Sequence, residues 1–226
     1  MKYGQIANNK ELNYNIYYCF DYLSENDQKK FAKKFNTQRH DFIQRMHTFG
    51  EIILGAYLSS RGFEVRHEYP VKDKTPDWCI LDKKSAVISI IDLANYHRDK
   101  DTENEIDQGH AIFWSRENFP KNRDRLYHCI RKKMQKYRAL IEKLRVPYTV
   151  AICPDWRAEL NFDDKIRDCL HNSEDGLFQM YPGVSGVLCF KWNFDQCSFK
   201  YEQNPNALRS VDLPSGAFSF VKEQLN

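Results

Sequence analysis

Apolar residues recur along the first half of the chain at spacings that predict two helices. Ser24 opens a Ser-x-x-Asp sequence, which is typical of a capped helix N-terminus and predicts a polar helix through about Phe35. A second helix is predicted by an apolar stripe with intervals of four, three, four and four residues, and Gly62 is expected to end it. The stripe consists of Phe42, Met46, Phe49, Ile53 and Tyr57.

Short runs rich in β-branched and aromatic residues follow this helix and predict strands. They are the segments 63–71, 77–81, 85–94 and 146–154, and residues 186–192 and 197–202 have the same character. Between them, apolar positions at helical spacing predict a long amphipathic helix over about 123–145, and residues 162–172 predict a shorter one. The order strand, strand, helix, strand indicates an α/β sheet with helices packed on it.

Composition limits the class of protein. With 226 residues, 42% of them hydrophobic, the chain can build a full core as one domain with elaborations or with a small appendage. Seven cysteines, an odd total without a C-x-x-C pair, indicate reduced thiols and no zinc site. No apolar leader and no stretch of about 18 apolar residues is present, so we expect a cytoplasmic protein without a membrane span.

The stretch TPDWCILDKKSAVISIIDLAN, residues 75–95, places two acids at the outer ends of a predicted β-hairpin. If residues 82–85 form the loop, Asp77 lies opposite Ile90, and Asp77 and Asp92 are diagonal neighbours on one face, about 7 to 8 Å apart. Two carboxylates at that separation suit Mg²⁺, which keeps several waters. Taken singly, each aspartate also fits a turn or capping residue.

These acids resemble a family pattern. Glu51 on a helix, then Pro76-Asp77, then Asp92 at the end of the next strand is similar to the PD-(D/E)xK nuclease superfamily over roughly residues 41–155. The resemblance implies a restriction-endonuclease-like α/β fold, a mixed central sheet flanked by helices, with an N-terminal helical extension over 1–40 and a C-terminal α/β elaboration over 156–226. It also implies Mg²⁺ or Mn²⁺ held by Glu51, Asp77 and Asp92, which would act as catalytic residues in the cleavage of DNA.

One position departs from the pattern. The family has a lysine two residues after the strand acid, where this chain has Ala94. Lys133 is the preferred substitute, because Lys133 to Tyr137 occupies the place of a Q-x-x-x-Y motif in some branches; Lys136 and Lys74 are weaker candidates. Lys133 is otherwise read as a solvated lysine on a polar helix face.

A basic cluster supports a nucleic-acid partner independently of the motif. Between residues 121 and 145 there are ten Lys or Arg and only two acids, Asp124 and Glu142. Such a cluster attracts phosphates, and Lys132, Lys133 and Lys136 are the predicted nucleic-acid-binding residues. A solvated helix face is the alternative reading of the same run.

Three classes of function remain after these observations. The first is metal-dependent hydrolysis of DNA phosphodiester bonds, with assembly as a homodimer or in a complex. The second is a catalytically inactive nuclease-fold module that binds nucleic acid or a partner protein, which the missing lysine favours. A thiol enzyme is the third, but no Cys and His spacing supports it.

Overall fold

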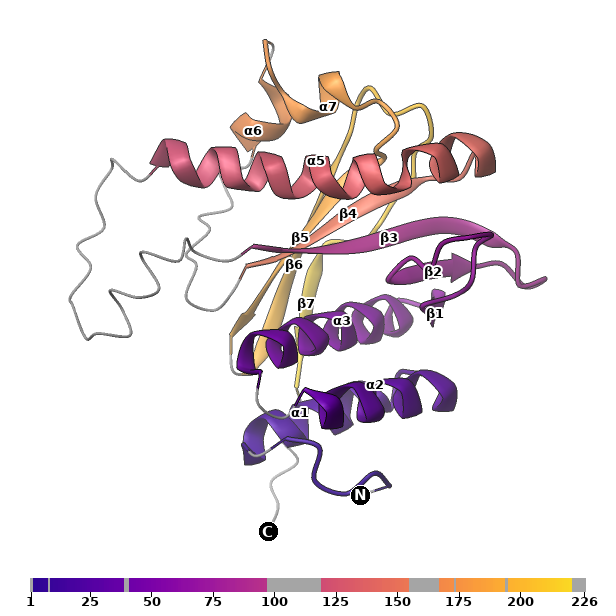
Figure 1. The fold of residues 1–226 in the computed structure, drawn as a ribbon, viewed down its shortest axis with the longest axis vertical. Coiled ribbons are helices and arrows are strands. Elements are labelled where there is room, and N and C mark those ends of the chain that lie inside the picture. The colour runs from indigo at the N-terminus through magenta and orange to yellow at the C-terminus, as the bar shows by residue number, and fades with distance from the viewer. Residues whose placement is uncertain are drawn as a thin grey trace. The chain divides into compact units, whose positions relative to one another are not determined.

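The computed structural model describes residues 2–7, 9–38, 41–96, 119–154, 167–172, 174–193 and 195–220 (Figure 1). It shows an α/β protein with N-terminal helices and a mixed seven-stranded sheet whose strands follow in chain order, β1 to β7. The chain forms two compact units. The first contains Met1–Leu93, Trp192–Lys200 and Pro214–Asn226, and the second contains Ala94–Lys191 and Tyr201–Leu213.

Three helices open the first unit: α1 (Lys10–Phe20), α2 (Glu25–Thr37) and α3 (Phe42–Ser60). The predicted N-cap of α2 is confirmed, since the Ser24 side chain accepts a hydrogen bond from the Asp27 N–H at 3.2 Å. Both α1 and α2 contact α3. The stripe analysis did not identify α1 as a separate helix.

Helix α3 is buried on every side over most of its length. All residues from Thr48 to Leu58 are buried, whereas Phe42, a member of the predicted apolar stripe, is 51% exposed. The predicted end is confirmed, because the helix stops at Ser60 and Gly62 has a φ of +88°. A helix that is covered on all faces also buries polar residues that a single-stripe analysis would assign to the surface.

An antiparallel meander follows α3, made of β1 (Glu64–His67), β2 (Trp78–Leu81) and β3 (Val87–Tyr96). The register differs from the prediction: Trp78 pairs with Ile91 and Leu81 with Val87, with a bulge beside Ile80 and Leu81. Continuing the ladder by one residue places Asp77 opposite Asp92 and not opposite Ile90. The shift is two residues, so the acids still share one face, as expected.

The C-terminal strands complete the first unit. Strand β7 (Gly216–Ser219) pairs antiparallel with the first half of β6 (Gln196–Gln203). Tyr57 of α3 stacks on Phe199 with ring centroids 3.6 Å apart, and its hydroxyl donates to the Pro214 carbonyl at 2.7 Å. These contacts fix α3 against the β6–β7 pair.

The second unit is built around a parallel pair, β4 (Tyr148–Pro154) and β5 (Gly186–Asn193). The long helix α5 (Phe119–Leu144) packs on β4, with the Tyr137 and Tyr148 rings 5.9 Å apart. Its predicted apolar face is confirmed at five buried positions: Leu126, Ile130, Met134, Tyr137 and Ile141. Two short helices, α6 (Arg167–His171) and α7 (Leu177–Met180), contact each other.

Some sequence-based predictions fall outside the described residues. They are the first part of the helix predicted over 162–172 and the acidic stretch 99–107. All seven cysteines lie in described segments and are free thiols. Among the described helices, none has the length and apolar character required to cross a membrane.

Candidate functional site

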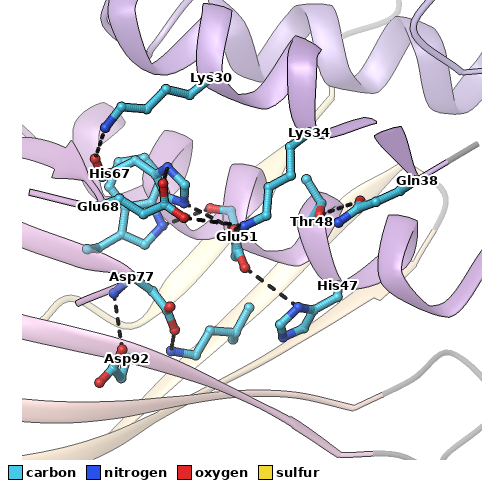
Figure 2. A network of polar contacts seen from close by, with 12 residues as sticks. Lys30, Lys34, Gln38, His47, Thr48, Glu51, His67, Glu68, Asp77 and Asp92 are labelled. Carbon is cyan, nitrogen blue, oxygen red and sulfur yellow. Dashed lines mark hydrogen bonds and ion pairs between the residues drawn. The ribbon is translucent and has the colours of Figure 1, made fainter. Parts of the chain in front are cut away.

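Glu51 lies at the centre of a buried cluster of charged side chains in the first unit (Figure 2). The side chain of Lys34 on α2 reaches its Oε2 at 2.7 Å, and His67 at the end of β1 places Nε2 3.1 Å from the same oxygen. His47, one helical turn before Glu51, has Nδ1 3.6 Å from Oε1. Read from its spacing alone, Glu51 is a surface residue; it is instead 2% exposed, because α3 is covered on all sides.

The surroundings of Glu51 favour its charged form. Burial by itself raises the pKa of this carboxyl, and the negative charge of Asp77 acts in the same direction. The hydrogen bond with His67 and the charge of Lys34 outweigh these effects, so the pKa of Glu51 is lowered below its usual value. The cluster therefore holds a buried carboxylate whose charged form is stabilised by Lys34 and by the hydrogen bond with His67.

Further contacts of this cluster join α2 to β1. The ammonium group of Lys30 donates to the His67 carbonyl at 2.9 Å, and the His67 ring lies 4.1 Å from the Phe31 ring. Glu68, whose φ of +46° is unusual for a residue with a side chain, lies 3.7 Å from the Lys34 ammonium. Its N–H donates to the Asp77 carbonyl at 3.1 Å, which connects the cluster to the two aspartates.

The Asp77 and Asp92 carboxylates accept backbone N–H groups from each other's segments, with Asp77 directly before β2 and Asp92 inside β3. The Asp77 N–H donates to Asp92 Oδ1 at 3.1 Å, and the Leu93 N–H donates to Asp77 Oδ2 at 2.8 Å. Asp92 is fully buried and Asp77 is half-buried. Burial and, to a lesser degree, the Asp92 charge raise the pKa of the neighbouring Cys79 thiol to about 12. These hydrogen bonds therefore orient two carboxylates on one face of the sheet, next to the Trp78–Ile91 pair that ends the β2–β3 ladder.

The aspartate pair suits a divalent cation better than the three-acid set does. Within the described part of the chain, no group of three or more His, Cys, Asp or Glu side chains is arranged as metal ligands. Glu51 is already engaged by Lys34 and His67. Mg²⁺ is commonly bound through one or two carboxylates, with water and substrate phosphate completing its shell, and Asp77 with Asp92 provides such a donor set.

The lysine candidates lie at different places in the fold. Ala94, two residues after Asp92, is buried, and Lys74 is half-buried in the turn before β2. Lys133 lies half-buried on α5 in the second unit, where Lys132 and Lys136 are exposed.

Within the described residues, Lys34 contacts a predicted site carboxylate, that of Glu51, and the sequence analysis missed it. It belongs to the polar run of α2, which also contains Lys29, Lys30 and Lys33, so its spacing gives no signal. Comparison of the chain with protein-family models, with curated proteins and with solved structures gave no match. Any function assigned to it therefore rests on its own residues.

Proposed function

We propose that the chain is a metal-dependent nuclease that hydrolyses DNA phosphodiester bonds. The observation that carries this proposal is the hydrogen bonding that links Asp77 to Asp92 and Leu93, next to the Trp78–Ile91 pair of the β2–β3 ladder, and that orients both carboxylates. Two like charges held close together repel, and a bound cation reduces that repulsion.

Asp77 and Asp92 would hold Mg²⁺ or Mn²⁺, which when bound lowers the pKa of a coordinated water and neutralises charge on the phosphate. The protein's own residues orient the two acids and keep Asp92 out of bulk water. Glu51 has a supporting role in this proposal: its carboxylate holds the Lys34 ammonium at 2.7 Å and adds a charge that interacts with Asp77. Lys34 thereby takes the place of Lys133 as the preferred basic group of the site.

DNA is the proposed substrate because of the basic cluster on α5, where Lys132 and Lys136 are exposed. Sequence-independent attraction of phosphates by lysines accounts for binding without base recognition. The proposal includes assembly as a homodimer or with a complex partner, which would allow both strands of a duplex to be cut.

A second candidate function is an inactive module of the same fold that binds nucleic acid or a partner protein. Two observations favour it. Ala94 occupies the position of the family's lysine and is buried, and Glu51 is neutralised by Lys34 and His67. A site that has lost catalysis does not need two acids held close together, however. The proximity of Asp77 and Asp92 therefore favours the nuclease.

Plasmid nicking in Mg²⁺ or Mn²⁺ separates the two candidates. For the nuclease we expect cleavage by the wild type and its loss in Asp77→Asn and in Asp92→Asn. The matched control is Asp73→Asn, which changes an exposed aspartate in the turn before β2. Binding of plasmid without nicking in either ion, or equal nicking by all four proteins, would overturn the nuclease proposal.

A further inference from the structure

Among the side chains that the structure describes on α5 and just after it, the exposed cations form a lysine stripe and an arginine stripe. At about 100° per residue, Lys132, Lys136 and Lys143 fall within about 40° of one another around the helix. Arg131 and Arg138, seven residues apart, fall within about 20° of each other on a different side. Arg145 is counted with them as the arginine stripe; it directly follows the helix and has a φ of +56°, so the helical spacing does not fix its side. All six side chains are exposed.

The two stripes differ in their acidic neighbours. Glu142 and Asp124, the exposed acids of the described part of this helix, both lie about 40° from the arginine stripe and about 100° from the lysine stripe. Arg138 is paired with Glu142, with Nε 3.0 Å from Oε1. The arginine stripe is therefore partly neutralised by its own helix, and the lysine stripe forms a line of positive charge.

We infer that the lysine stripe, Lys132, Lys136 and Lys143, contacts the phosphate backbone of one strand of duplex DNA. Its length supports this partner. Eleven residues of helix at 1.5 Å each place the outer lysines about 16 Å apart, which equals the axial rise of about five base pairs of a duplex. Lys133 lies about 80° from the middle of the lysine stripe, toward the buried face, and is half-buried, so it is left out of the contact.

This inference rests on the proposed function, because the nuclease proposal is what identifies DNA as the bound polyanion. The inference places the DNA-binding surface on one side of α5 and predicts that the arginine stripe contributes little to the affinity for DNA. The contact involves charge and no base edges, so we expect binding to be independent of sequence and to weaken steeply with salt.

The test compares two triple variants with the same change in charge on the same helix. A labelled 30-base-pair duplex is titrated in EDTA with the wild type, with K132Q/K136Q/K143Q and with R131Q/R138Q/R145Q, at several salt concentrations. We expect the lysine variant to bind about 10-fold or more weakly at 150 mM salt and its log–log salt slope to lose about 3, one per phosphate contact. The arginine variant is expected to retain most of the affinity and slope, and circular dichroism checks that both variants stay helical.

Equal losses in the two variants, or no loss in either, would overturn the inference, as would a wild type that binds an acidic peptide but no duplex. Because the titration contains no divalent cation, it is separate from the nicking assay. If the wild type nicks plasmid but the lysine variant binds duplex as tightly as the wild type, the nuclease proposal stands and the lysine-stripe inference fails. If the lysine variant loses binding but the wild type does not nick in Mg²⁺ or Mn²⁺, the lysine-stripe inference stands and the nuclease proposal fails.

Discussion

The buried pair between Lys34 and Glu51 should stabilise the fold by an amount that a double-mutant cycle can measure. At 2.7 Å and an effective dielectric constant of about 20, the attraction between the two charges is about 6 kcal/mol. Desolvation of the nearly buried Glu51 and of Lys34, whose side chain is 29% exposed, offsets much of it. We therefore expect a coupling free energy of about 1 to 3 kcal/mol.

The cycle uses the wild type, Lys34→Met, Glu51→Gln and the double variant. The free energy of unfolding of each protein is measured in urea. Lys34→Met removes the Lys34 charge from the buried Glu51 carboxylate, leaves its hydrogen bond with His67, and should lower the free energy of unfolding by about 2 kcal/mol. The loss of unfolding free energy in the double variant should be smaller than the sum of the losses in the two single variants, because neither the Lys34 nor the Glu51 charge remains without its partner. Lys33→Met, an exposed change on the same helix, should stay within about 0.5 kcal/mol of the wild type.

The same carboxylate predicts a dependence on pH. The pKa of Glu51 is lower in the folded protein than its usual value, so its stabilising contribution is present above about pH 4.5 and is lost as the pH falls through the folded pKa. The stability difference between wild type and Glu51→Gln should therefore shrink below pH 4.5. Additive effects in the cycle to within about 0.5 kcal/mol, together with a pH-independent difference, would refute the reasoning.

Three further predictions concern other parts of the fold. Gly55→Ala should destabilise the protein by about 1 to 3 kcal/mol in urea, because the added methyl group would overlap the Trp78 ring, which is held by its Nε1 bond to the Glu51 carbonyl. Cys79 should resist alkylation in the folded protein up to pH 10, as its buried thiol has a pKa raised to about 12; mass mapping after iodoacetamide treatment checks this. Tyr201, whose pKa is raised to about 12 mainly by burial, should ionise late in an ultraviolet titration, and Tyr201→Phe should remove that late step.

Local sequence signals were sufficient for the elements that depend on local interactions. The α2 cap at Ser24 and the buried face of α5 follow from hydrogen bonding within one turn and from a 3.6-residue period, and both are present. Strand β3 was predicted because a run rich in Ile and Val suits a buried interior strand. Strand β7, with four residues, and helix α1 were not predicted, because their positions depend on packing against distant parts of the chain.

The register and the charge cluster required information that the sequence does not contain locally. Leu81 pairs with Val87 and not with Ala86, which shifts the ladder by one residue, and the bulge leaves Ile88 unpaired in the β2–β3 ladder and 47% exposed, which shifts it by one more. The shared face of Asp77 and Asp92 was nevertheless predicted correctly, since side chains on a strand repeat every two residues. The contact of Lys34 with Glu51 could not be predicted from the sequence, because α2 and α3 meet through tertiary packing and the two residues are 17 positions apart.

The three acids that the sequence groups together differ in the groups that hydrogen-bond them. Glu51 has lysine and histidine nitrogens within 3.1 Å of one oxygen, and the Lys34 charge stabilises this buried carboxylate. Asp77 and Asp92 each accept a backbone N–H, which orients their carboxylates. The nuclease proposal therefore assigns the divalent cation to Asp77 and Asp92, and it assigns Glu51 the structural task of holding Lys34 of α2. The chemistry proposed for this chain depends first on Asp77 and Asp92.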